Sequence, residues 1–441
     1  MFRTISLGNP SSLGPCIRAQ SVSEPSPTIM EPSTEPHPRD DRQSQDSIDT
    51  DSESGSQESA KARIERLGRQ RPSVFHSTWA EVAFVFSIAM SQVLTETFVS
   101  GFTVILPILV RELDVPSASL VWPATAFSLP IAASLLFFGR LGDMYGGYIV
   151  YVAGMIWLSL WSVVAGFSTS PLMLIFCRAL QGLGAAAFLP TGVMLMGSIY
   201  RPGPRKNLVF SIYGASAVLG FFTGIFFAGV VGQYTRWGWY FWIGAILSAI
   251  TALSSYLSIP SDSAERRSNG VTMDWLGAAL IFCGLSLTVY AITDSAHAPQ
   301  GWRTPYILAL LLLGCSLVAA AFYHEGWSAK APLLPFSIFA VKSMTPLIVA
   351  LMLNYGVLGV YLVYATQYMQ LFMGASPLQV VAWYVPMIVG GIFLSTAGGF
   401  ILHLIPGRAL LAFSGTGWIV ALLCFAIAPM GANYWAFTFP R

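Results

Sequence analysis

The sequence predicts an all-α protein that crosses a membrane many times. Of its 441 residues, 54% are hydrophobic and only 10% are charged, whereas a domain folded in water carries about 25% charged residues. The apolar residues also form continuous runs of the length that a membrane-spanning helix needs, about 20 residues. Strands of a membrane barrel would alternate polar and apolar residues, so these runs favour helices.

Eleven apolar runs are long enough to be complete spans. They lie near residues 82–106, 118–138, 148–168, 172–198, 208–232, 239–259, 274–294, 305–323, 344–372, 378–400 and 408–430. We assign the first six to an amino-terminal six-helix bundle, residues 79–260. The next two form a pair of linker spans with their loops, residues 261–342, and the last three form an incomplete carboxy-terminal bundle, residues 343–441.

Residues 1–78 precede the first bundle and are predicted to form a disordered cytosolic tail. They lack the early apolar segment of a cleavable signal. Ser, Pro, Glu, Asp and Gln dominate from Ser21 to Ser59, and such a composition cannot bury a core. A plain solvated extension and a phosphorylated regulatory tail are both compatible with it.

The basic residues predict the orientation in the membrane. The amino-terminal tail and the loops on its side of the membrane carry Lys61, Arg63, Arg66, Arg69, Arg71, Arg140, Arg201, Arg205, Lys206, Arg266, Arg267, Lys330, Lys342 and Arg408. The opposite side carries only Arg111, Arg236 and Arg303. Because cytosolic loops hold an excess of Lys and Arg, we predict a cytosolic amino terminus.

The carboxyl end of the chain carries the beginning of a further apolar segment, which starts at Tyr434 and stops at Arg441. This segment is far shorter than the roughly 20 residues needed to cross a membrane. We therefore expect a truncated version of a longer design. A natural protein of eleven spans with a short external tail is the alternative.

Other classes of protein have little support in the composition. A net charge of +2 does not indicate a nucleic-acid partner. The cysteines are isolated, where packing is their ordinary role, and the histidines show no metal-ligand spacing; they are Cys16, Cys177, Cys283, Cys315, Cys424, His37, His76, His297, His324 and His403. We expect no metal, no cofactor and no enzymatic activity.

The loop between the second and third spans is the most informative segment. It reads Gly139-Arg140-Leu141-Gly142-Asp143-Met144-Tyr145-Gly146-Gly147. Glycines allow a tight turn, and Asp143 can cap the next helix or pair with a cation. The segment resembles the loop signature of the major facilitator superfamily, Gly-x-Leu-(Ala/Gly)-Asp-(Arg/Lys)-x-Gly, with matches at Gly139, Leu141, Gly142, Asp143 and Gly146. Basic residues are usual in that family where this chain has Met144, Gly147 and Tyr148.

A second match lies in the fourth span, Arg178-Ala179-Leu180-Gln181-Gly182-Leu183-Gly184. A charge at this depth costs at least about 2.5 kcal/mol on insertion scales, so Arg178 should face an aqueous cavity or a partner. The run resembles the family element Arg-x-x-Gln-Gly-x-Gly, which implies a role of Arg178, with Gln181, in proton coupling or substrate binding. An arginine that extends to the membrane interface is the alternative. Gly182 and Gly184 offer a thin face for helix packing.

Glu96 is the only acidic residue that we place deep in the first bundle, beside Gln92 and Thr95. A carboxyl group removed from water can bind and release a proton near neutral pH. Glu96, with Gln92 beside it, is therefore our candidate proton carrier, and Arg178 its candidate partner. A structural glutamate hydrogen-bonded to backbone or to a neighbouring span is the alternative.

Two segments around the fifth span extend the resemblance. Gly220 and Gly224 form a GxxxG packing face, and this span is similar to the antiporter element Gly-Pro-x-x-Gly with Phe221 at the proline position. The run Arg236–Trp242 resembles the aromatic start of the sixth span in the fourteen-spanner drug:proton antiporter family. An interfacial aromatic belt explains the same rings.

The order of six spans, two extra spans and a resumed bundle also resembles that family. The runs Asp274–Gly277 and Tyr434–Pro440 look most like fungal aminotriazole-resistance-type transporters. The resemblance implies a multi-pass protein of the plasma or vacuolar membrane that exchanges or exports a small organic solute or drug by alternating access, coupled to protons. A transport-inactive truncated membrane protein and a receptor-like scaffold are the alternatives.

Overall fold

The computed structural model describes residues 66–116, 119, 121–268, 270–401 and 406–426. The chain divides into two units, Met1–Gln57 and Glu58–Arg441, and all described residues belong to the second. They form helices joined by short loops, and no strand occurs among them. Most of the predicted tail, the segment from Tyr434 to Arg441, Cys16 and His37 lie outside the described residues.

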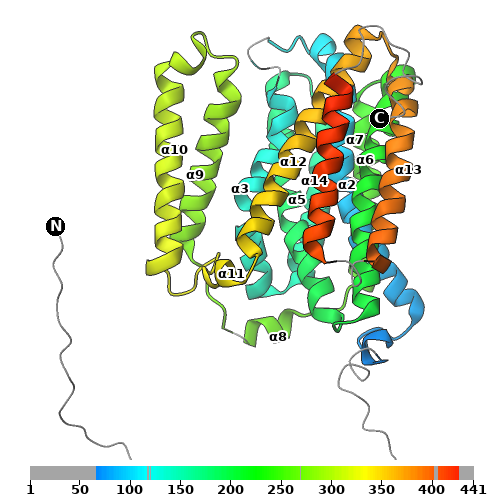
Figure 1. Cartoon of the computed structure of the whole chain (residues 1–441), viewed down its shortest axis with the longest axis vertical. Coiled ribbons are helices and arrows are strands. Elements are labelled where there is room, and N and C mark those ends of the chain that lie inside the picture. Colours follow the sequence, from blue (N-terminus) through cyan, green and yellow to red (C-terminus); the bar gives the residue numbers. More distant parts are fainter. Residues whose placement is uncertain (1–65, 117–118, 120, 269, 402–405, 427–441) are drawn as a thin grey trace, which may run out of the picture. The chain divides into compact units, whose positions relative to one another are not determined.

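Each of the eleven predicted spans corresponds to a helix (Figure 1). These are α2 (Thr78–Glu112), α3 (Trp122–Tyr145), α4 (Gly147–Gly166), α5 (Pro171–Ile199), α6 (Pro204–Tyr234), α7 (Gly238–Ser258), α9 (Trp275–Ser295), α10 (Pro305–Tyr323), α12 (Met344–Gln367), α13 (Pro377–Ile401) and α14 (Gly407–Ala426). Within the described part of the chain, 10 helices are long and apolar enough to cross a membrane, and the apolar stretch of α14, Gly407–Leu423, is shorter. The predicted all-α, many-spanning fold is confirmed.

Polar residues at the ends of the apolar runs define where the helices begin. The Ser77 side chain accepts a hydrogen bond from the Ala80 N–H at the start of α2, and Ser170 does the same for Met173 at the start of α5. Such N-caps satisfy amide groups that have no partner inside the helix. The loops contain two further short helices, α8 (Ser263–Ser268) and α11 (Ser337–Ala340), and a π-helical turn at His324–Ser328.

Glycines allow the helices of the first bundle to cross closely. A Cβ atom added at Gly220 of α6 would lie 2.7 Å from the Val93 Cα of α2, and one added at Gly224 would lie 2.6 Å from the Thr97 carbonyl oxygen. In α5, Gly182 lies against the Phe127 carbonyl of α3, and Gly184 lies against α4. All four glycines that we expected to pack therefore lie at crossings, as small residues between membrane helices do.

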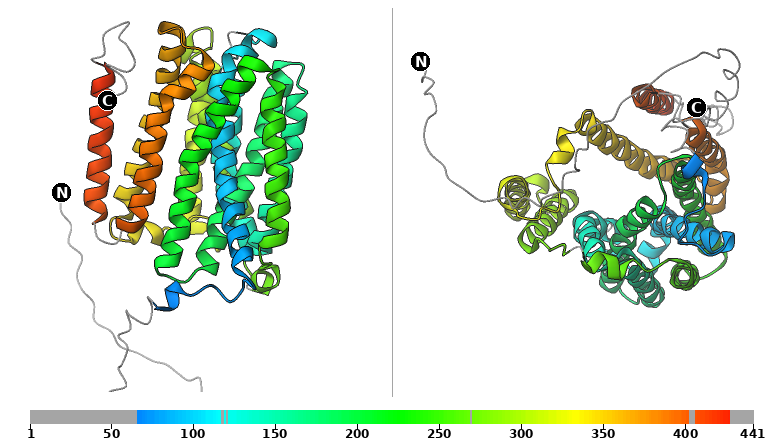
Figure 2. Two further views of the ribbon diagram at one scale, coloured as in Figure 1. Left: turned by 90° about the vertical axis from the view of Figure 1, so that its right-hand side faces the viewer. Right: turned by 90° about the horizontal axis from the view of Figure 1, so that it is seen from below.

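The two extra helices, α9 and α10, form a hairpin beside α3, and α13 packs on α6 (Figures 1 and 2). At one end of the hairpin, the Asp294 carboxylate of α9 accepts hydrogen bonds from Trp122 Nε1 at 3.3 Å and from the Tyr306 hydroxyl at 2.8 Å. Near the other end, the rings of Phe137 and Trp275 lie 6.1 Å apart. The hairpin is thus attached to α3 at both ends.

The loops predicted to share one side of the membrane lie at one end of the helices, together with α8 and α11 (Figure 1). Residues 66–77, the described part of the predicted tail, pack there: Phe75 is 3% exposed and lies against the Phe84 and Tyr200 rings. Gly68 contacts Gly203 in the loop between α5 and α6. This part of the predicted tail therefore belongs to the folded unit, because its apolar side chain is buried.

Candidate functional site

Glu96 lies on α2 where this helix faces both α6 and α12. Gln92, one turn earlier, donates a hydrogen bond from Nε2 to Glu96 Oε1 at 3.2 Å. Tyr213 of α6 and Tyr355 of α12 both lie near enough to Glu96 for a charge on its carboxylate to act on their phenols. None of the salt bridges formed by the described residues includes Glu96. The sequence predicted that Glu96 lies beside Gln92. The structure adds Tyr213 of α6 and Tyr355 of α12 to the residues near Glu96.

Tyr355 also borders a cavity of about 320 Å³ between α12 and α14. The lining residues are Leu351, Asn354, Tyr355, Leu358, Leu410, Leu411, Ser414 and Trp418. The sequence analysis did not single out the polar or aromatic residues of this lining, Asn354, Tyr355, Ser414 and Trp418. Their common feature is a polar or aromatic group on an otherwise apolar helix, a pattern too frequent in membrane helices to single them out.

Arg178 lies in a different place from Glu96, inside the first bundle. Its side chain is fully buried; Nε donates to the Pro123 carbonyl at 3.2 Å and Nη2 to the Phe98 carbonyl at 3.0 Å. The guanidinium lies over the Phe102 and Phe127 rings, with its carbon 4.2 and 4.7 Å from the ring centroids. Arg178 therefore bridges α2 and α3.

Two expectations for this region need correction. Arg178 forms no ion pair with Glu96: its Nε and Nη2 donate to two backbone carbonyls, its guanidinium lies over two aromatic rings, and its Nη1 is buried with no hydrogen-bond partner among the described residues. It neither faces a cavity nor extends to an interface, since its exposure is zero. Gln181 is equally enclosed and donates from Nε2 to the Ser162 hydroxyl of α4 at 2.8 Å.

The segment from Gly139 to Gly147, which the sequence predicts as a loop, is helical except at Gly146: its first residues are the last turns of α3, and Gly147 begins α4. We call this segment the Asp143 loop; it packs on α5 and on the segment that follows α7. A Cβ at Gly142 would lie 2.6 Å from Thr191 Cγ2, and Gly146 adopts a φ of +102°, which favours glycine. Gly139 approaches Pro190 of α5. Arg140 donates to two backbone carbonyls, Thr272 at 3.0 Å and Ala331 at 3.4 Å.

Asp143 of this loop has a cation partner from elsewhere in the chain. Its carboxylate lies 3.5 Å from Arg266 of α8, and Arg266 in turn lies 3.6 Å from Asp262. Asp262 accepts hydrogen bonds from the Gly147 and Tyr148 amides at 3.0 and 3.2 Å. Of the two roles that the sequence left open for Asp143, the structure shows the pair with a cation, and the cap of α4 is made by Asp262.

Glu81, at the start of α2, is a buried acid that the sequence analysis did not identify. It is 5% exposed and accepts hydrogen bonds from Arg205 Nε at 2.7 Å, from Arg205 Nη2 at 2.5 Å and from the Tyr200 hydroxyl at 3.0 Å. Burial, together with the Glu81 carboxylate, raises the pKa of the Tyr200 phenol, so its hydroxyl remains a donor. This cluster joins α2 to the end of α5 and the start of α6.

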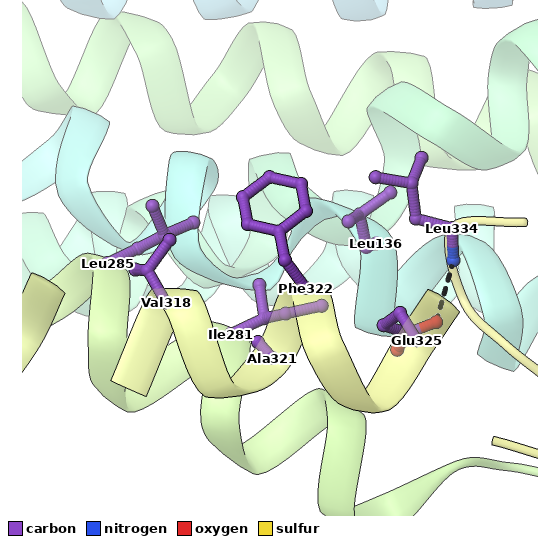
Figure 3. Close-up of a pocket in the computed structure, with 8 residues that line it drawn as sticks. All are labelled: Leu136, Ile281, Leu285, Val318, Ala321, Phe322, Glu325 and Leu334. Carbon is purple, nitrogen blue, oxygen red and sulfur yellow. Dashed lines mark hydrogen bonds between the residues drawn. The ribbon is translucent and has the colours of Figure 1, made fainter. Parts of the chain in front are cut away.

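Figure 3 shows a second cavity, of about 130 Å³, between α3 and the α9–α10 hairpin. Leu136, Ile281, Leu285, Val318, Ala321, Phe322, Glu325 and Leu334 line it. Glu325 Oε2 accepts a hydrogen bond from the Leu334 amide at 3.1 Å. The lining is mainly aliphatic and aromatic, so we interpret this cavity as a packing void. Among the described residues, no group of three His, Cys, Asp or Glu side chains could hold a metal ion.

Comparison of the sequence with known protein families identifies the family of this chain. The model described as Major Facilitator Superfamily matches residues 88–440. The chain belongs to the major facilitator superfamily. Membership, together with the many apolar helices, makes this facilitator an integral multi-pass membrane protein and a transporter.

The relatives of this facilitator are transporters and resistance proteins. It is 33% identical to the "Low affinity ammonium transporter" of Saccharomyces cerevisiae over 90% of this chain and 77% of the relative. It is 31% identical to "Efflux pump terJ" of Aspergillus terreus over 84% and 72% of the two chains. It is 29% identical to the "Aminotriazole resistance protein" of Saccharomyces cerevisiae over 83% and 68%. The resemblance to the fungal aminotriazole-resistance type is thereby confirmed.

A solved structure supports the fold. The crystal structure of a peptide transporter in complex with sulfate superimposes on this facilitator with a TM-score of 0.53, at 17% identity, over 81% of this chain and 78% of the other. At this level of identity the similarity concerns the fold alone.

Proposed function

We propose that this facilitator exchanges or exports a small organic solute against protons, with Glu96 as the proton-binding group. The observation that carries the proposal is a membrane-depth carboxylate that has no cation partner among the described residues and lies where α2 meets α6 and α12. Sites at the junction of two helix bundles are where alternating-access transporters bind their solutes. Gln92 donates a hydrogen bond to the carboxyl group, and Tyr213 of α6 and Tyr355 of α12 lie near it.

The chemistry of this site favours a solute with positive charge. A charged carboxylate without a counter-ion is costly inside a membrane. Either a proton or a cationic solute removes this cost, so the two compete for Glu96, and their competition is sufficient to couple exchange. Tyr355 and Trp418 add aromatic faces, which attract organic cations. Two names among the relatives support this proposal: the ammonium transporter is named for a cation, and the efflux pump is named for export.

The test is flux into liposomes that contain the full chain, with an acidic interior, and with potassium and valinomycin to clamp the membrane potential. Tetraethylammonium is a suitable first probe because it carries a permanent charge and cannot cross as a neutral base; ethidium and aminotriazole complete the panel. If one proton leaves for each cation that enters, a gradient of one pH unit should give up to about tenfold accumulation. Equal flux with and without the gradient for all three probes would contradict proton coupling, and no flux at all would favour a receptor-like or inactive protein.

We further propose that the end of the bundle formed by α8, α11 and the Asp143 loop faces the cytosol. The clustering of Arg140, Arg201, Arg205, Arg266 and Arg267 at this end supports the orientation, because Lys and Arg are enriched in cytosolic loops. A cysteine placed at exposed Tyr145, in a chain whose native cysteines are replaced, should resist an impermeant maleimide added to intact cells and react after permeabilisation. Labelling in intact cells would reverse the assignment.

A further inference from the structure

The segment between α7 and α9 supplies groups that the loop from Gly139 to Gly147 lacks. Helix α4 starts at Gly147 with no acidic residue in its first turn and no side-chain cap of its own. Its first amides would lack partners. Asp262, 115 residues further along the chain, accepts from the Gly147 amide at 3.0 Å and from the Tyr148 amide at 3.2 Å. Its negative charge also suits the positive end of the helix dipole.

The same segment supplies the positive charge. Between Gly139 and Gly147 the sequence carries a single basic residue, Arg140, and this arginine donates to the Thr272 and Ala331 carbonyls. Arg266 approaches Asp143 to 3.5 Å and Asp262 to 3.6 Å, so it lies between the two carboxylates. The neighbouring Arg267 lies over the Tyr145 ring, with its carbon 5.9 Å from the centroid.

The Asp143 loop also contacts the segments at the ends of the extra helices α9 and α10. Arg140 of the loop donates to the Thr272 carbonyl, just before α9, and to the Ala331 carbonyl, beyond α10. The segment from Asp262 to Thr272 is thus fastened to the loop at Asp262, Arg266 and Thr272. Gly146 permits this contact, because a Cβ there would lie 2.8 Å from Asp262 Oδ1 and from Ser263 Cα.

We propose that Asp262 and Arg266 are positioning residues for transport: Asp262 holds the start of α4, and Arg266 completes the charge network of Asp143. Together they fix the loop and tie the α9–α10 hairpin to the amino-terminal bundle. Both residues lie in a segment remote in sequence from the loop that they serve. Neither touches the solute site at Glu96, so they act on the rate of the conformational cycle and not on solute binding. The effect on rate rests on the transport activity proposed above.

The first test needs no transport. Hydrogen exchange of the full chain in liposomes reports directly on the Gly147 and Tyr148 amides. Asp262→Ala should raise their exchange rates at least about tenfold, the effect of losing a helix cap. Asp262→Asn should leave them within about threefold of the native rates, because Asn caps as well as Asp. Native exchange in Asp262→Ala would overturn the positioning role of Asp262, whether or not the chain transports.

The second test compares the transport rates of single and double variants. The solute is one of tetraethylammonium, ethidium and aminotriazole that the native chain transports. Arg266→Gln should lower the maximal rate about two- to fivefold, the equivalent of one exposed ion pair, with KM unchanged. Arg266→Lys should restore the rate, and the matched control Arg267→Gln should stay at the native rate. Asp143→Asn combined with Arg266→Gln should be no slower than either single variant, since the two act as a pair. A native rate in Arg266→Gln, additive losses in the double variant, or a change confined to KM would overturn the proposal for Arg266. Absence of transport by the native chain would instead count against the proposed function.

Discussion

Replacing Glu96 with Gln is expected to abolish accumulation driven by a pH gradient. Glutamine keeps the size of the side chain and can still hydrogen-bond to Gln92, but it binds no proton in the physiological range. With one pH unit across the membrane, accumulation should fall from up to about tenfold to the level reached without a gradient. The measurement is tetraethylammonium uptake into liposomes, with ethidium and aminotriazole as further probes, normalised to the amount of folded protein.

The matched control is Glu112→Gln, the same substitution at an exposed position at the end of the same helix. It should leave accumulation unchanged. Glu96→Asp retains a carboxyl group and should keep coupling with a lower rate, because the shorter side chain withdraws from Tyr355. If Glu96→Gln accumulates tetraethylammonium as the native chain does, Glu96 is a structural residue and another group carries the proton.

The apolar runs were sufficient to predict where the helices lie, because the requirement to satisfy backbone groups in lipid leaves helices as the structure for such runs. Helix ends were harder to predict. Helix α2 extends from Thr78 to Glu112, beyond the apolar run at 82–106, since polar residues continue a helix outside the hydrocarbon. That difference hid Glu81, which is buried because Tyr200 at the end of α5 and Arg205 in the first turn of α6 lie against it.

In the candidate site, contacts within one helix could be predicted from the sequence, whereas contacts between helices could not. Gln92 and Glu96 are one turn apart, so their contact follows from the helix period. The partners of Arg178 are backbone carbonyls on two other helices, and the cap of α4 is Asp262, 115 residues away. No periodicity in the sequence encodes these contacts. A buried arginine prompts a search for a carboxylate, yet the contacts of Arg178 are backbone carbonyls and aromatic rings, and its Nη1 has no hydrogen-bond partner among the described residues.

Replacing Arg178 with Ala is expected to destabilise the first bundle as well as to slow transport. The change removes two charge-assisted hydrogen bonds and the contacts with Phe102 and Phe127 in a fully enclosed site. A buried hydrogen bond to a charged group contributes about 1.5–3 kcal/mol, so we expect a loss of at least about 3 kcal/mol. Thermal unfolding in detergent, followed by tryptophan fluorescence, measures it.

Conservative replacements separate a structural role of Arg178 from a role in coupling. Lysine keeps the charge but lacks the planar fork that reaches two carbonyls, so Arg178→Lys should recover only part of the stability. The matched control Arg236→Ala removes an exposed arginine that also lies near an aromatic ring, Trp237 at 5.8 Å, and should leave stability unchanged. If Arg178 bridges α2 and α3 as the contacts indicate, the surviving folded Arg178→Lys molecules should retain their dependence on the pH gradient. Native stability of Arg178→Ala together with lost pH dependence would instead assign Arg178 to proton coupling.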